Sequence, residues 1–450
     1  MKRIIVVLSC MLSVVSLHAQ KTVSLEECRN LAIQNNKELQ ISGEKIKMAD
    51  YERKAAITKY FPQLSAMGGY LWNQKDINLI DFGQLGAIGQ ILPTSVKDHF
   101  RLDIENIWIG NVSLVQPVFM GGKIIAYNQI TEYARQLAES MNDMQLQDVI
   151  YQTDETYWQV ISLVHKKSLA DAYVDLLRKM DRDVTEMINE GVATYADGLS
   201  VKVKLNEAEI AQVKVDNGLA LSRMLLAQIC GLPLDEPVTL ADEGLDNYPV
   251  QSKTVMADMN EAFANRNELR SLDLATKIYE KQENIVLADM LPNVALSANY
   301  LVTNPNAFNG FKNDFAGMFN VGVMLKVPIS GWWEGSYKRN SAKAETFIKR
   351  LEWEDAREKI ELQVNQSVYK VNEAQKQLVA TTRNMESADE NLRIATLGFE
   401  EGIIPALNLM EAQTAWVSAK SSLIDSQIEV KLTDIYLTKA LGKLSVNEEK

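Results

Sequence analysis

Few residues in this chain have the types and spacing that catalysis or metal binding requires. The three histidines are His18, His99 and His165, and none has another histidine or cysteine at metal-ligand spacing. His165 falls on a predicted helix, where a packed or solvated imidazole is far more common than a ligand. No glycine-rich phosphate-binding loop followed by Lys and Ser or Thr occurs, and nothing marks a Ser-His-Asp arrangement. We therefore expect no enzyme activity, no metal and no cofactor.

The first 19 residues have the pattern of a cleaved secretory signal. Lys2 and Arg3 precede an apolar run from Ile4 to Val15, and the segment closes at Ala19. The run is shorter than the roughly 20 residues that span a bilayer. A lipid-attachment site at Cys10 is disfavoured, because the apolar run before it is too short.

Two cysteines, Cys28 and Cys230, remain after the signal. An exported protein is allowed a disulfide, but spacing does not decide the pairing. The sequence favours two packed thiols and leaves the bond open.

Charge and hydropathy exclude two classes of protein. The net charge of −12 argues against nucleic acid as a partner. After the signal no segment has 18 uninterrupted apolar residues, so any mature membrane span must consist of β-strands.

The sequence consists of two similar copies. Near the start of each copy, matched residues are 230 positions apart. Further along, the separation is 211 positions. The matched residues are Ala32, Asn35, Glu38, Leu39 and Pro62 with Ala262, Asn265, Glu268, Leu269 and Pro292, then Pro117, Gly191 and Gly231 with Pro328, Gly402 and Gly442. A unit of this length is a half-domain, not a solenoid repeat. The sequence therefore predicts a signal peptide (1–19), repeat 1 (20–231), a linker (232–253), repeat 2 (254–444) and a tail (445–450).

Each repeat begins with a helix followed by a β-hairpin. The helices are expected from Ser24, which forms a capping box with Glu27, to about Tyr60, and from Thr254 to about Met290. Apolar and polar residues then alternate, which predicts hairpins over 64–116 and 293–327. The four strands are Leu64 to Asn73, Ile107 to Gln116, Val294 to Val302 and Phe319 to Val327. Their length of about ten residues suits a tilted crossing of a bilayer. The aromatic residues at their ends fit a membrane boundary and ordinary strand composition equally well.

Each repeat continues into a long helical hairpin, expected over 118–230 and 332–441. A helix over most of the 74 residues from Pro117 to Gly191 would reach roughly 100 Å. In the second copy apolar residues recur every seven positions, which predicts an antiparallel coiled coil. They are Val371, Leu378, Met385, Leu392 and Phe399, then Leu409, Trp416, Leu423, Val430 and Leu437. Both hairpins turn at a glycine, Gly191 or Gly402, which can adopt the left-handed conformation.

This order of elements resembles the TolC-like outer-membrane factor family over nearly the whole mature chain. The marks are Tyr60-Phe61-Pro62-Gln63-Leu64 and Met290-Leu291-Pro292-Asn293-Val294, Pro117 and Pro328, and the Glu-Gly turns. The resemblance implies an α+β membrane protein, a homotrimer. Four strands per chain would form a 12-stranded transmembrane β-barrel, continued by a long periplasmic α-helical coiled-coil barrel. Four strands alone would leave open edges in lipid, which is not tolerated.

The resemblance also implies a function and sites. The chain would be the outer-membrane channel of a tripartite efflux or type I secretion system in a Gram-negative bacterium, passive and coupled to a periplasmic adaptor and an inner-membrane transporter. The adaptor would dock at two hairpin tips, and a periplasmic constriction would involve Asn408 and Glu411. The expected docking residues are Gly191, Val192, Ala193, Thr194 and Tyr195, with Gly402, Ile403, Ile404 and Pro405.

The chain departs from the family pattern near the second tip. Members commonly have two aspartates three residues apart, whereas here Asn408 and Glu411 stand at those positions. Ile404 and Pro405 also replace residues that are usually polar, which puts the family's gating bonds in doubt. The cargo, the particular pump and the gating residues are not specified by the sequence.

Two alternatives belong to other classes. A periplasmic coiled-coil adaptor or structural protein would share the helical hairpins but would not require four alternating strands. A surface-exposed enzyme or binder using the loop around His99 lacks a catalytic cluster.

Overall fold

The computed structural model describes residues 22–98, 100–235, 238–244 and 257–445. The predicted signal peptide, His99 and residues 245–253 of the predicted linker lie outside them. The chain forms two compact units, and each draws on both halves of the sequence. Unit 1 consists of Met1–Ile46, Ala138–Ser271 and Glu352–Lys450, and unit 2 of Lys47–Leu137 and Leu272–Leu351.

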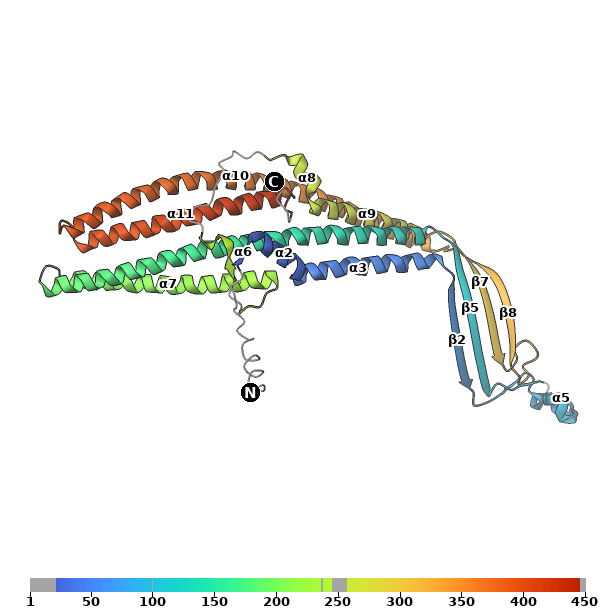
Figure 1. Ribbon diagram of the computed structural model, residues 1–450. Coiled ribbons are helices and arrows are strands. Elements are labelled where there is room, and N and C mark those ends of the chain that lie inside the picture. The colour runs from blue at the N-terminus through green and yellow to red at the C-terminus, as the bar shows by residue number, and fades with distance from the viewer. Residues whose placement is uncertain (1–21, 99, 236–237, 245–256, 446–450) are drawn as a thin grey trace, which may run out of the picture. The chain divides into compact units, whose positions relative to one another are not determined.

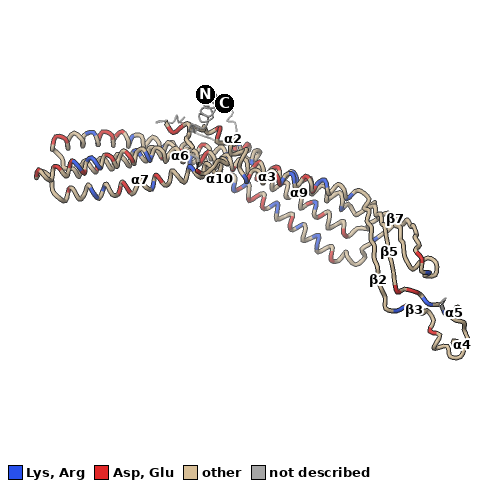
Figure 2. The backbone as a smooth tube through the Cα atoms, turned by 60° about the horizontal axis from the view of Figure 1, so that its bottom comes forward, with Lys and Arg blue, Asp and Glu red and all other residues tan. Residues whose placement is uncertain are grey.

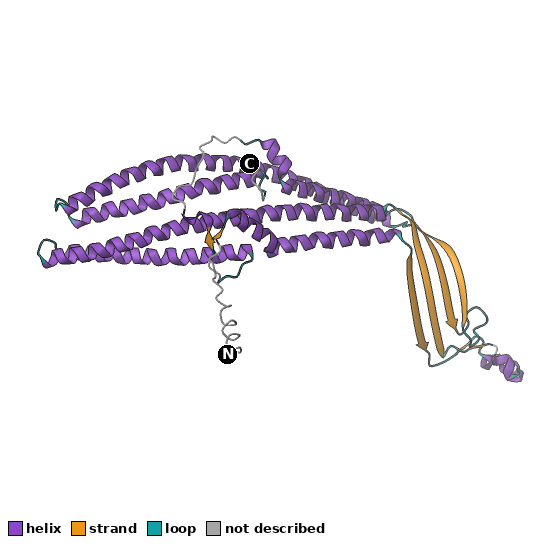
Figure 3. Ribbon diagram, viewed as in Figure 1, coloured by secondary structure: helices purple, strands orange, loops and turns teal. Residues whose placement is uncertain are grey.

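Unit 2 contains a four-stranded antiparallel sheet in the order β2-β5-β7-β8 (Figures 1 and 3). The strands are β2 (Gln63–Trp72), β5 (Asn106–Met120), β7 (Asn293–Asn304) and β8 (Ala316–Lys326). All four expected strands are present. The second strand of the first hairpin pairs with the first strand of the second, so β2 and β8 are the two edges.

Strand β5 continues beyond its expected end. We placed the start of the helical hairpin at residue 118, but the strand runs through Pro117 to Met120. The last residue of β5 that pairs with β2 is Val115, so beyond it β5 has a neighbour on one side only. A register shift between Pro117 and Phe119 accommodates the proline, as is usual at sheet edges and bulges.

The strands are nearly free of charge. Within the four described strands a single charged residue occurs, Lys326 at the end of β8, and Figure 2 shows the contrast with the helices. The apolar face predicted for β8 is exposed: Phe319, Val321 and Val323 are 65%, 67% and 68% exposed. Nothing else in the described chain covers this face.

The loop expected between β2 and β5 has secondary structure of its own. It contains the ribbon β3 (Ile77–Asn78) and β4 (Arg101–Leu102), with short helices α4 (Gly86–Ile91) and α5 (Thr94–Asp98) between them. The Arg101 guanidinium donates to Asp76, which lowers the pKa of that carboxyl.

The chain passes between the two units four times, always inside a helix. The crossings lie in α3 (Lys37–Ile57), α6 (Lys123–Asn189), α9 (Asn267–Ala288) and α10 (Gly331–Glu400). The 67 residues of α6 correspond to a length of about 100 Å.

The first helix of each copy is broken, where we expected continuity. Helix α2 (Leu25–Asn35) starts at the predicted Ser24–Glu27 capping box and ends before Asn36, whose ψ of 126° is extended. The Asn36 side-chain oxygen accepts from the backbone N–H groups of Glu38 and Leu39 at 2.9 and 3.2 Å and so begins α3. In the second copy Arg266 separates α8 (Met259–Asn265) from α9.

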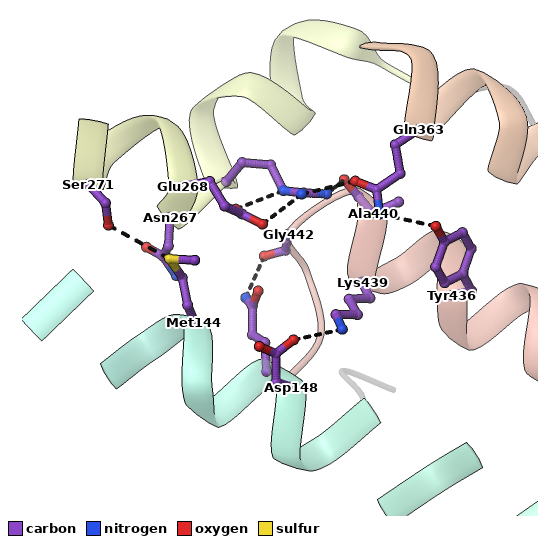
Figure 4. Close-up of polar contacts among 12 residues, drawn as sticks. Met144, Asp148, Asn267, Glu268, Ser271, Gln363, Tyr436, Lys439, Ala440 and Gly442 are labelled. Carbon is purple, nitrogen blue, oxygen red and sulfur yellow. Dashed lines mark hydrogen bonds and ion pairs between the residues drawn. The ribbon is translucent and has the colours of Figure 1, made fainter. Parts of the chain in front are cut away.

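In unit 1, each break contacts the C-terminal end of the second helix of a helical hairpin. Arg266 donates to the carbonyl of Ala440 at 3.0 Å and to Glu268 and Gln363, a convergence of α9, α10 and α11 (Ala406–Ala440) shown in Figure 4. Asn36 donates to the carbonyl of Ile229 in α7 (Tyr195–Cys230). Ile229 and Ala440 are 211 residues apart, the offset found in the sequence.

The predicted linker is partly a strand. Residues Thr239–Leu240 form β6, which pairs in parallel with β1 (Thr22–Val23), and the side chains of Val23 and Leu240 are buried in one hydrophobic cluster with Tyr157. Cys28 and Cys230 lie in the same cluster as free thiols.

Candidate functional site

The first hairpin turns in a compact, exposed tip. Gly191 has a φ of 79°, and the N–H groups of Val192 and Ala193 both donate to the carbonyl of Met187, at 2.9 and 3.2 Å. Val192 and Tyr195 are 67% and 74% exposed. The tip is therefore a hydrogen-bonded turn with exposed apolar side chains.

Helix α7 starts at this tip with a capping box. The Thr194 hydroxyl accepts from the Asp197 N–H at 3.2 Å, and the Thr194 N–H donates back to the Asp197 carboxylate at 2.9 Å. The Thr194 hydroxyl and N–H together lower the pKa of Asp197. The cap is complete above the ordinary pKa of an aspartate and is lost as the pH falls through the lowered value.

The second tip repeats the first in its backbone hydrogen bonds. Gly402 has a φ of 68°, and the N–H groups of Ile403 and Ile404 both donate to the carbonyl of Gly398, at 2.8 and 3.1 Å. Its cap differs, because Pro405 precedes α11 without a side-chain hydrogen bond. Ile403 is 77% exposed.

One hydrophobic cluster brings the two tips together within unit 1. It joins α6, α7 and α11 through residues such as Val184, Val201 and Leu409. Ile188 beside the first tip and Ile404 of the second pack against it. The nine predicted docking residues thus lie at the same end of one packed body.

The predicted constriction residues share an exposed face of α11. Asn408 and Glu411 are three positions apart, and the same stripe of exposed residues continues along the helix. Its further members are Ala415, Ser418, Ser422, Asp425 and Glu429. The opposite side of the helix carries Leu409, Ala412 and other buried residues, so the stripe has no cover within the described chain.

Among the contacts that join the first hairpin to the second, two lie beside this stripe and were not revealed by the sequence. Lys166 of α6 pairs with Asp425 of the stripe at 2.6 Å, and the hydroxyls of Tyr173 and Thr414 lie 3.1 Å apart. The partners are more than 240 residues apart, so no local pattern could have indicated them.

A shallow groove runs beside these contacts. It has a volume of about 290 Å³ and is mostly apolar. Its lining includes Leu169, Tyr173, Ala211, Val215, Thr414 and Val417.

Neither metal ligation nor helical membrane crossing has a candidate among the described residues. No three His, Cys, Asp or Glu side chains gather there to hold a metal. No described helix combines the length and hydropathy needed to cross a bilayer.

A family model described as "Outer membrane efflux protein" matches residues 28–232 and 259–443. The chain belongs to this family. The match covers both helical hairpins and all four strands. It omits part of the linker and both ends of the chain.

Among curated proteins, the chain is similar to Outer membrane protein TolC of Escherichia coli K12, at 21% identity over 323 residues. That match covers 67% of this chain and 64% of TolC. Protein CyaE of Bordetella pertussis is 18% identical over 302 residues, which cover 66% of this chain and 63% of CyaE. The chain thus matches slightly less than two thirds of the length of these relatives.

Solved structures of the same fold cover more of the chain. The outer-membrane channel OprN matches with a TM-score of 0.76 and 16% identity, over 93% of this chain and 90% of that one. The Campylobacter jejuni CmeC outer membrane channel matches with a TM-score of 0.74 and 13% identity, over 94% of this chain and 87% of that one. The names of these two structures describe channels and not enzymes, and at such identities they establish the fold of this chain alone.

Proposed function

We propose that the chain is the outer-membrane channel of a tripartite efflux or type I secretion system and conducts substrates passively. One observation carries the proposal. Within the described residues, four strands with a single terminal charge have an uncovered apolar face and two unpaired edges. Lipid is the environment in which such a face is stable, provided that the edges are closed.

Edge closure supports a homotrimer. The sheet has an even number of antiparallel strands, so β2 and β8 run in opposite directions. The β8 edge of one copy can therefore pair with the β2 edge of the next in the same antiparallel sense. Three copies would supply the twelve strands of a closed barrel, and the helical hairpins would extend into the periplasm. A soluble adaptor, the alternative, has no use for these strands.

The two tips are the proposed docking surface for a periplasmic adaptor, which would connect the channel to an inner-membrane transporter. Exposed Val192, Tyr195 and Ile403 supply apolar contact area on hydrogen-bonded turns. Asn408 and Glu411 are the proposed constriction, because their stripe is polar and uncovered. Three copies would bring three Glu411 carboxylates around one axis. The Lys166–Asp425 and Tyr173–Thr414 contacts would hold α11 against α6 in the closed state.

The test uses two adjacent residues on opposite faces of β8. Val323→Arg places a charge on the proposed lipid face, at a cost of about 2–4 kcal/mol at mid-depth. Met324→Arg places the same charge on the other face, where Lys326 already lies. We expect Val323→Arg to reduce the heat-modifiable trimer in outer-membrane fractions, with Met324→Arg close to wild type. Equal trimer yields for the two variants would contradict the barrel, and recovery of the wild-type protein in the soluble fraction would favour the adaptor.

A further inference from the structure

Cys28 and Cys230 lie in the same hydrophobic cluster in the core of unit 1. Cys28 belongs to α2 and Cys230 is the last residue of α7, and each is 1% exposed. The Cys230 thiol lies 3.6 Å from the carbonyl oxygen of Cys28. The neighbouring Cys230 side chain and burial both raise the pKa of the Cys28 thiol.

The backbones around the two cysteines are also held at close range. The Asn35 amide of α2 donates to the carbonyl of Cys230 at 3.2 Å. The next residue, Gly231, has a φ of 68°, and a Cβ built there would lie 2.3 Å from the Cβ of Asn35. A disulfide needs two Cα atoms within about 7 Å and converging side chains. The hydrogen bond and the close approach at Gly231 hold the end of α7 against α2 beside the two cysteines.

The second half of the chain lacks this pair. At the offsets of the two copies, Asp258 stands for Cys28 and Leu441 for Cys230. Asp258 caps α8 through a hydrogen bond from the N–H of Asn260 at 2.9 Å. The equivalent junction is therefore built without a cysteine pair, so the general fold does not require one.

We propose that Cys28 and Cys230 form a disulfide in the exported protein and fasten α2 to the end of α7. This inference rests on the proposed function, because it requires that the protein is exported. The oxidant is the disulfide of an envelope thiol oxidase. A thiolate of the chain attacks that disulfide, the second thiolate then displaces the oxidase from the mixed disulfide, and the oxidase leaves as a dithiol. The chain loses two protons and two electrons, and the oxidase disulfide gains the two electrons.

The expected consequence is greater stability with no change in the channel surface. The bond closes a loop between residues 202 positions apart, and long loops lose much entropy in the unfolded state when they are closed. Oxidation must precede complete folding, because both sulfurs are buried in the finished core. Once formed, the bond is shielded from reductants by the same burial.

The test measures thiols in protein purified from the cell envelope without reductant. The sample is unfolded in detergent and treated with a maleimide–polyethylene glycol reagent, with or without earlier reduction. We expect wild type to gain label only after reduction and Cys28→Ala to be labelled at Cys230 without it. Heating in the presence of reductant, which reaches the bond as the core opens, should lower the apparent melting temperature of wild type by several degrees and leave that of the Cys28→Ala/Cys230→Ala variant unchanged.

Two outcomes overturn the disulfide. One is full labelling of wild type without reduction in protein that fractionates with the outer membrane. The other is that Cys230 in the Cys28→Ala variant also takes up label only after reduction, which would indicate disulfides between chains. Membrane fractionation of the same samples tests the channel separately. An oxidised pair in protein absent from the outer membrane would support the bond and contradict the proposed function.

Discussion

Replacing Asp154 with asparagine should lower the stability of unit 1 by about 3–5 kcal/mol, the usual cost of removing one charge from a buried ion pair. Arg29 of α2 donates to both carboxylate oxygens of Asp154 in α6, each at 2.7 Å. The two side chains are 6% and 0% exposed. The asparagine keeps the shape of the side chain but removes the carboxylate charge that accepts both hydrogen bonds from the buried guanidinium.

The assay is thermal unfolding of the purified protein, followed by circular dichroism at a fixed scan rate. An unfolding entropy of about 2.1 cal/mol/K per residue corresponds to roughly 1 kcal/mol per degree for a chain of 450 residues. The midpoint should therefore fall by about 3–5 °C by the same scaling.

The control is an ion pair of similar geometry on the surface. Arg393 and Glu390 of α10 approach to 2.7 Å, but their side chains are 59% and 56% exposed. Glu390→Gln should change the midpoint by less than about 1 °C, because exposed pairs contribute little. If Asp154→Asn shifted the unfolding midpoint as little as Glu390→Gln does, the reasoning would be refuted. The double change Arg29→Met/Asp154→Leu should recover much of the loss, since it removes both buried charges.

Three further predictions concern the glycine junction, the tips and the constriction. Gly231→Ala should destabilise the protein by about 1–3 kcal/mol more than Gly402→Ala, because both have a φ of 68° but only Gly231 meets a neighbour, Asn35 at 2.3 Å; equal thermal midpoints would contradict this. Replacing residues 192–196 with a neutral linker should preserve the trimer on gels and abolish export, measured as the susceptibility of a deletion strain to a panel of toxic compounds; full protection by this variant would remove the docking role. Glu411→Gln should weaken cation selectivity in single-channel recordings more than Glu429→Gln, which lies on the same stripe about 27 Å further along the helix; unchanged selectivity would exclude a carboxylate ring.

The elements that local chemistry determines could be predicted from the sequence. The capping box at Ser24, the four strands and the turns at Gly191 and Gly402 occur at or within a few residues of the expected positions. Prolines, glycines and apolar periodicity act within a few residues, so they are visible in a single sequence. The heptad positions Val371, Val430 and Leu437 are buried as the coiled-coil pattern predicts.

The features that were missed depend on partners far along the chain. The two-residue strand β6 exists because β1 lies beside it, and its partner Thr22 is 217 residues before Thr239. The break at Arg266 is stabilised by the carbonyl of Ala440, 174 residues later. Lys166 and Thr414 likewise find their partners on the other hairpin. The positions of the tips could be predicted from their glycines, whereas the contacts that join the two hairpins could not.

The four helical crossings between the compact units have a practical consequence. An interdomain boundary is normally an exposed, irregular segment that a protease can cut and an engineer can sever. Here residues 46/47, 137/138, 271/272 and 351/352 all lie within α3, α6, α9 and α10. The hydrogen-bond ladder of each helix continues through the boundary. Limited proteolysis should therefore release no intact unit, and neither unit is an independent module that could be transplanted onto another scaffold.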